Sequence, residues 1–360
     1  MIFRAWLALA AHSFCFTALA VAADDAPTPA DPYWTLIHDE AVLADLKLTA
    51  SQREAMRAAL DPLDLQCFPL RNRSASEANE GFANAAAAAR KELAKILKPA
   101  QNQRLDQIVV RSQGTDALLR DDLAAKIKLT DKQREGIRKL ISETRAAKAK
   151  LQSDLRASKL QAGEAQEKFN KLAAEDRDAI NGLLTNEQKT RLAPLIARDF
   201  DVSKLGSTAF KTPDLIGDSG AWLGTSPLTA ESLRGRVVVL HYFAFGCINC
   251  IHNYPTYREW QKELAGKNVQ LIGIHTPETK AEHDVAKLQT KLKAEELEFP
   301  VLVDNEKGNW NAWGNNMWPS VYVLDKRGYM RAFWAGELKW QGANGDAQMR
   351  QKIDELLAEK

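Results

Sequence analysis

Cysteine is scarce in this sequence, and its long middle part has almost no tyrosine or tryptophan. Its net charge is also close to zero, at +2, with 49 Lys and Arg against 47 Asp and Glu. A dedicated nucleic-acid-binding protein carries a concentrated basic face, so we expect no nucleic-acid partner. A zinc ribbon needs two cysteine pairs, and the chain has one Cys-x-x-Cys pair, at Cys247 and Cys250, which excludes a ribbon.

The one long apolar run lies near the N-terminus, at residues 5–20. A basic residue precedes it, and the small residues Ala-Val-Ala follow at 20–22, as at a signal-peptide cleavage site. Two polar residues interrupt the run, which is short for a membrane anchor, the alternative interpretation. We therefore predict a signal peptide over residues 1–22, which would remove Cys15, and a location in the periplasm.

The next region is dominated by residues that favour helix. Residues 23–39 are proline-rich and predict a spacer. Residues 40–200 are rich in alanine, leucine, lysine, arginine and glutamine, which predicts an all-α region. Apart from Tyr33 and Trp34, residues 33–200 contain neither Tyr nor Trp.

A five-residue motif, Leu-Thr-x-x-Gln, recurs in this helical region. Its copies begin at Leu48, Leu97, Leu129 and Leu184. Thr at the N-cap and Gln at position N3 form a capping box, so each copy predicts the start of a helix. The second copy has Lys98 and Pro99 after its leucine, and proline is favourable at the first helical position.

The repeated motif resembles that of the periplasmic Spy/CpxP family, small all-helical chaperones and stress-response modulators. Its spacing suggests two tandem modules, at about 40–112 and 118–200. The resemblance implies unfolded proteins as clients of this region.

From residue 201 on, strand and helix patterns alternate. We expect a buried central strand from Val237. We expect further strands at 269–275 and 299–304, a helix at 278–296, a hairpin at 320–334 and a closing helix at 346–359. The chain is thus predicted to be multidomain, with a thioredoxin-like α/β fold, a mixed sheet flanked by helices, at 201–360.

The Cys-x-x-Cys pair follows the central strand and begins a helix, the arrangement that thiol–disulfide exchange needs. Two intervening residues let the sulfurs close a disulfide, and the helix N-terminus favours the thiolate. Cys67 is left over as a third redox group, an intermolecular link or a buried residue. Cys247, Cys250 and His252 could bind copper or zinc, but the helix directs both thiols to one edge, so we expect no metal or other cofactor.

Several motifs in the same order resemble the thioredoxin-like C-terminal domain of the DipZ family, related to TlpA-type periplasmic redoxins. They are Trp222-Leu223, 228–235, 246–250, 274–278, 299–305, 310–315 and Trp318-Pro319. The resemblance implies Cys247 as nucleophile, Cys250 as resolving thiol and Pro319 as a cis-proline facing them. It makes Trp318 a candidate for substrate contact.

Two positions depart from the thioredoxin pattern. Gly246 stands where Trp usually precedes the first cysteine, so the reactive sulfur would be less shielded. His241 stands six residues before Cys247, in place of a buried carboxylate that helps the resolving thiol lose its proton. An imidazole could do the same, and a core histidine is the alternative.

Together these features predict an exported thiol–disulfide oxidoreductase with a redox-active disulfide. Its partners would be protein disulfides or dithiols and a membrane-linked electron donor or acceptor. One alternative is a peroxiredoxin-like peroxidase, although the Pro-x-x-x-Thr-x-x-Cys pattern of those enzymes is absent. Another is a periplasmic chaperone or stress sensor whose Cys-x-x-Cys pair is only structural.

Overall fold

The computed structural model describes residues 31–156 and 159–359. The predicted signal peptide over 1–22, with Cys15, lies outside these residues. The described chain forms two compact units, one from residues 31–53 and 90–207 and the other from residues 54–89 and 208–359. The helical region expected at 40–200 therefore contributes to both units.

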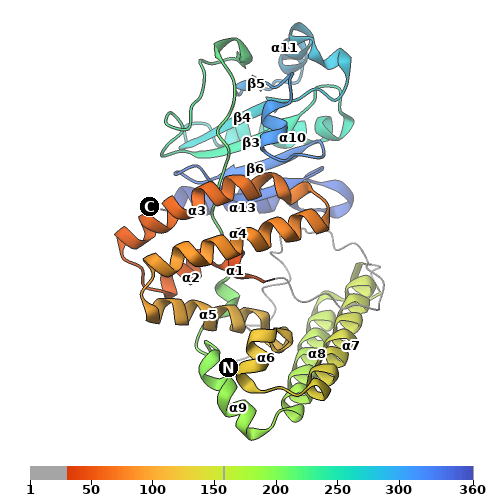
Figure 1. Ribbon diagram of the computed structural model, residues 1–360. Coiled ribbons are helices and arrows are strands. Elements are labelled where there is room, and N and C mark those ends of the chain that lie inside the picture. Colours follow the sequence, from red (N-terminus) through yellow and green to blue (C-terminus); the bar gives the residue numbers. More distant parts are fainter. Residues whose placement is uncertain (1–30, 157–158, 360) are drawn as a thin grey trace. The chain divides into compact units, whose positions relative to one another are not determined.

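The first unit is helical. Its elements are α1 (Tyr33–Leu36), α2 (Glu40–Asp45), the start of α3 (Ala50–Cys67), the end of α4 (Ala75–Ile96), α5 (Pro99–Gln113), η3 (Gly114–Leu119), α6 (Asp121–Ile127), α7 (Asp131–Arg156), α8 (Ala162–Leu183), α9 (Asn186–Leu192), η4 (Ala193–Leu195) and η5 (Val202–Lys204). Helices α7 and α8 run side by side (Figure 1). Within the described chain, no helix combines the length and the apolar character needed to cross a membrane.

Each of the four motif copies begins a helix, as predicted, and their glutamines also meet in pairs. Gln52 Nε2 donates to Gln101 Oε1 at 2.8 Å. Gln133 and Gln188 exchange two such bonds, both of 2.9 Å. Each amide thus joins the starts of two helices, and the two halves of the predicted tandem repeat share one arrangement.

The second unit contains a seven-stranded mixed sheet in the order β1-β7-β6-β3-β4-β5-β2. The central strand β3 (Val237–Phe243) is buried along its whole length, pairs parallel with β4 (Val269–His275) and pairs antiparallel with β6 (Ser320–Leu324). The remaining strands are β1 (Phe210–Lys211), β2 (Trp222–Leu223), β5 (Val301–Val303) and β7 (Tyr329–Ala335). This is the thioredoxin-like mixed sheet predicted from the sequence.

Helices pack on one face of the sheet around a core that includes both cysteines of the Cys-x-x-Cys pair. These helices are α10 (Ile248–Glu263), α11 (Val285–Ala294) and α13 (Gly345–Ala358). Short helical turns at η6 (Ser219–Ala221), η7 (Lys280–His283) and η8 (Trp340–Gly342) lie in the connections. The helices cover the side of β3 that carries Val237, Val239 and Phe243.

The opposite side of the sheet is rich in aromatic rings and is covered by α12 (Gly308–Ala312) and η2 (Phe68–Asn72). The buried ring of Phe68 meets Trp313 edge to face, with ring centroids 5.3 Å apart. Arg71 Nη2 donates to the carbonyl of Trp313 at 2.7 Å and to the Tyr322 hydroxyl at 3.2 Å. The helical segment 54–89 is therefore part of the core of this unit.

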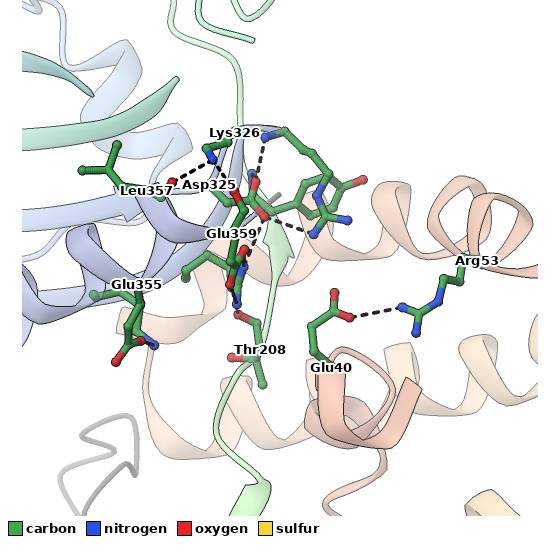
Figure 2. A network of polar contacts seen from close by, with 12 residues as sticks. Glu40, Arg53, Thr208, Asp325, Lys326, Glu355, Leu357 and Glu359 are labelled. Atoms are coloured by element: carbon green, nitrogen blue, oxygen red, sulfur yellow. Dashed lines mark hydrogen bonds and ion pairs between the residues drawn. The ribbon is translucent and has the colours of Figure 1, made fainter. Parts of the chain in front are cut away.

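A polar cluster fastens the C-terminal end of α13 to the sheet (Figure 2). The side chain of Arg331, 3% exposed, forms an ion pair with Glu359 at 2.9 Å and another with Asp325 at 3.5 Å. Its Nε donates to the carbonyl of Thr208 at 3.1 Å, and Lys326 Nζ donates to the carbonyl of Glu359. Because Arg331 is buried, its charge would be costly without such partners, and the two carboxylates compensate it.

The helix predicted over 278–296 begins later than expected: α11 starts at Val285. Asp284 is the N-cap and accepts from the N–H of Lys287 at 3.1 Å. The preceding residues form the turn η7, in which the Glu282 side chain is drawn inward. The apolar pattern does not reveal this break, because polar side chains set it: Thr279 and Glu282 form the capping box of η7, and Asp284 caps α11.

Candidate active site

Cys247 and Cys250 lie where the central strand passes into a helix. Cys247 is the N-cap residue of α10, and its carbonyl accepts from the N–H groups of Cys250 and Ile251, both at 3.1 Å. Cys247 is 9% exposed and Cys250 is fully buried. Thiol–disulfide exchange needs this difference in solvent exposure, because a substrate must reach the nucleophilic thiol while the resolving thiol lies behind it.

The pKa values of the two thiols shift in opposite directions. The hydrogen bond with the Cys250 side chain outweighs burial and lowers the pKa of Cys247 from 9.0 to about 7. Burial raises the pKa of Cys250 far above its ordinary value, and the hydrogen bond with Cys247 adds to the rise. The negative charge of Glu278 raises both pKa values. At neutral pH the thiolate therefore resides on Cys247.

Alkylation of the reduced protein by iodoacetamide should follow the thiolate of Cys247. A pKa of about 7 predicts a rate that is half-maximal near that pH and falls about tenfold per pH unit below it. Cys67 should stay unmodified, since burial raises its pKa to about 12. Peptide mapping by mass spectrometry across the pH range measures each site. A half-maximal rate near the pKa of a free thiol, about 8.5, would contradict the prediction.

The Trp318–Pro319 peptide bond is cis, as the sequence predicts. Pro319 directly precedes β6, whose first residue Ser320 pairs with Tyr242 near the end of β3. Because β3 and β6 are antiparallel, the start of β6 and the end of β3 lie at the same end of the sheet. Pro319 precedes β6 and the Cys-x-x-Cys turn follows β3, so both lie at that end of the two strands.

Trp318 is half-buried, and its ring makes both a hydrogen bond and a stacking contact. Its Nε1 donates to the carbonyl of Thr276 at 3.0 Å, and its ring stacks on Trp310 with centroids 3.8 Å apart. The preceding Met317 is 45% exposed, and Ile248, directly after the first cysteine, is 61% exposed. Apolar surface is thus available to a substrate beside both halves of the predicted site.

Two buried histidines accompany the site. His241 is on β3, and its ring stacks on Tyr257 of α10 with centroids 4.2 Å apart. His275 ends β4 and stacks on Phe245. Burial lowers the pKa of His241 to about 3 and that of His275 to about 4, so both are neutral at neutral pH. Participation of His241 in catalysis stays a prediction.

Sequence reasoning missed Glu282, although it is buried beside the turn that precedes the nucleophile. Its Oε1 accepts from the N–H of Gly246 at 2.8 Å. The residues between Thr276 and Glu282 thus contact both the Cys-x-x-Cys turn and, through the Thr276 carbonyl, Trp318. The glycine before Cys247 is the one sequence feature that could have indicated such a contact.

The two remaining candidate residues lie apart from this chemistry. His252 Nδ1 is 3.0 Å from Glu337 Oε2 on the surface. Cys67 is buried at the end of α3. Within the described residues, no three His, Cys, Asp or Glu side chains are grouped as a metal site would require.

Comparisons with known proteins point to the sheet-containing part of the chain. Residues 209–333 match the model of the AhpC/TSA family. Protein DipZ of Mycobacterium bovis is 32% identical over 170 residues, which cover 45% of this chain and 23% of DipZ. The chain thus spans about a quarter of the length of the DipZ relatives it matches.

Smaller proteins are matched over almost their whole length. Thiol-disulfide oxidoreductase YkuV of Bacillus subtilis is 26% identical over 148 residues, 41% of this chain and 94% of YkuV. The solved structure of a thiol-disulfide isomerase from Corynebacterium glutamicum is 24% identical and covers 41% of this chain and 98% of its own, with a TM-score of 0.35. The C-terminal part of the chain, with its thioredoxin-like mixed sheet, thus resembles AhpC/TSA proteins, Protein DipZ and the thiol-disulfide oxidoreductase YkuV.

Proposed function

We propose that the protein is an exported thiol–disulfide oxidoreductase that exchanges disulfides with protein substrates through Cys247 and Cys250. One observation carries the proposal. Two thiols share the first turn of a helix, and one is partly accessible with a lowered pKa while the other is buried with a raised pKa. When the pKa values of two neighbouring titratable groups shift in opposite directions, the two groups often have different chemical roles in an active site.

In the proposed reaction the Cys247 thiolate attacks one sulfur of a substrate disulfide. The substrate S–S bond breaks, its other sulfur leaves as a thiolate that takes up a proton, and a mixed disulfide with Cys247 forms. Cys250 then loses its proton and attacks the Cys247 sulfur. The substrate leaves as a dithiol, having gained two electrons, and the protein keeps the Cys247–Cys250 disulfide. The reverse sequence installs a disulfide in the substrate.

The proposal extends to location and partners. The predicted signal peptide over 1–22 supports export to the periplasm, where a membrane-linked donor or acceptor would recharge the pair. We propose that the Spy/CpxP-like helical region binds unfolded clients and so raises the effective concentration of their disulfides at the site. The paired glutamines, which repeat in the two halves of that region, support two modules of one kind.

The reduction potential of the pair tests this function. Equilibration of the full chain in glutathione buffers, followed by thiol trapping, should give a single two-electron transition. A value near −270 mV, about that of thioredoxin, would indicate a reductant, and one near −120 mV would indicate an oxidant that installs disulfides. A pair that does not titrate at all would overturn the proposed function.

A peroxidase is the second candidate, because the matched family model is that of AhpC/TSA proteins. Peroxide would then be reduced by Cys247 alone, with oxidation of its thiolate to a sulfenic acid and release of water or an alcohol. A Cys250→Ser variant that consumes peroxide for one turnover at the wild-type rate would favour this function. Failure of Cys247 to react with peroxide would exclude it.

A further inference from the structure

Glu282 is a buried carboxylate whose hydrogen bonds join two separate segments of the chain. It is 4% exposed, on the turn η7. Its Oε2 accepts from the N–H groups of Glu278 and Thr279, at 2.9 and 2.7 Å, and from the Thr279 hydroxyl at 3.0 Å. Its Oε1 accepts from the N–H of Gly246 at 2.8 Å. The Oε2 contacts are a local capping box, whereas the Oε1 contact reaches a residue 36 positions away in the sequence.

The carboxylate also accounts for the glycine in front of the nucleophile. A Cβ atom at Gly246 would lie 2.9 Å from Glu282 Oε1, closer than real Cβ atoms approach other atoms. Gly246 is not among the residues with positive φ. Space for the carboxylate, rather than backbone conformation, therefore favours glycine at this position.

We propose that Glu282 is a positioning residue for Cys247, because its carboxylate holds the backbone of Gly246 and so fixes the turn that presents the nucleophile at the start of α10. This inference rests on the proposed function, in which Cys247 is the nucleophile that Glu282 positions. Burial alone would raise the pKa of Glu282, but the hydrogen bonds from Thr279, Gly246 and Glu278 outweigh it and lower that pKa. The group is thus ionised at neutral pH, and charge-assisted hydrogen bonds of this kind are the stronger ones.

The segment that carries Glu282 also touches the other half of the predicted site. The Thr276 carbonyl accepts from Trp318 Nε1 beside the cis-proline. Glu278, between the two contacts, places its charge close enough to raise the pKa of both thiols. A shift of this segment would therefore disturb the nucleophile, its electrostatic surroundings and the proline loop together.

The variant Glu282→Gln separates the contact with Gly246 from the capping box. The chain itself shows that glutamine serves at this position, since Gln188 Oε1 accepts from the N–H of Thr185 at 2.9 Å in a capping box of the same kind. Three donors surround Oε2 of Glu282 and one faces Oε1. The single amide oxygen should therefore turn to the capping box and leave the NH2 group against the N–H of Gly246.

The experiment measures the pH profile of iodoacetamide alkylation at Cys247 in the reduced full chain. Loss of the fixed turn should raise the pKa of Cys247 by roughly half to one unit and slow alkylation at neutral pH about threefold. The titratable groups near this thiol are Cys250 and Glu278, neither of which the variant changes. If Glu282 acted only as a nearby negative charge, its removal would lower the pKa of Cys247. A lowered or unchanged pKa therefore overturns the proposal.

Two further variants keep the test decisive. Gly246→Ala places a Cβ atom against the carboxylate and should raise the pKa of Cys247 in the same way, even if Glu282→Gln does not fold. The two changes together should do little more than either alone, because both break one contact. Thr279→Val removes one hydroxyl from the capping box and should leave the profile unchanged. A shift as large as that of Glu282→Gln would assign the effect to the capping box and overturn the proposal.

The alkylation rate reports the ionisation of the Cys247 thiol and does not require disulfide exchange with a substrate. If the wild-type pair does not titrate in glutathione buffers, the proposed function fails while the positioning of Cys247 can still be measured. If the pair does titrate and the profiles of Glu282→Gln and Gly246→Ala match that of the wild type, only the positioning role fails.

Discussion

Serine in place of Cys250 should trap the protein in covalent complexes with its substrates, and serine in place of Cys247 should abolish exchange. Without the resolving thiol, the mixed disulfide formed at Cys247 has no internal route to release. Without the nucleophile, the buried Cys250 remains, with a pKa raised by burial and little access to substrate. We expect a loss of at least about a thousandfold in Cys247→Ser, because the buried thiol offers almost no thiolate at neutral pH.

Turnover with a reducible protein substrate, followed by non-reducing electrophoresis, measures both effects. Cys67→Ser is the matched control, since it removes a third buried thiol whose pKa burial raises to about 12. This variant should keep the wild-type rate and should form no trapped complexes. Near-normal exchange by Cys247→Ser would mean that the pair is only structural, as in the chaperone or stress-sensor interpretation.

The parts of the site that are close together in the sequence could be predicted from it. The run of β-branched residues from Val237 and the following Cys-x-x-Cys place the thiols at the end of a buried strand, and β3 and α10 confirm this arrangement. The strand at 269–275 has the predicted bounds. Periodicity and spacing carry this information because each feature depends on neighbouring residues.

Features that depend on distant partners could not be predicted. The hydrogen bond from the backbone N–H of Gly246 to Glu282 joins residues 36 positions apart, which no local sequence pattern reveals. Likewise, the apolar pattern of α3 does not distinguish packing against other helices from packing against a sheet. The packing of Phe68 and Arg71, in η2, against the sheet therefore appears only in the structure.

Alanine in place of Phe68 should destabilise the sheet-containing unit by about 3–5 kcal/mol, the usual cost of deleting a buried phenylalanine ring. Phe68 is 3% exposed and packs against Trp313, and the guanidinium of Arg71 lies 4.0 Å from the centre of its ring. The substitution leaves a cavity between the helical segment 54–89 and the sheet and loosens the position of Arg71. Such a loss is a large part of the total stability of a typical domain, about 5–15 kcal/mol.

Tryptophan fluorescence during thermal unfolding reports on this unit, because seven of the nine tryptophans lie between Trp222 and Trp340. We expect the fluorescence midpoint of Phe68→Ala to fall by roughly 10 °C. Leu65→Ala, on the preceding helix α3, is the matched control, since Leu65 is 41% exposed and should tolerate truncation with little change. Equal midpoints for the two variants would show that segment 54–89 does not stabilise the sheet-containing unit. A selective loss in Phe68→Ala would instead mean that a redox domain cut at residue 201 lacks part of its own core, because the ring that closes this face of the sheet comes from the helical region.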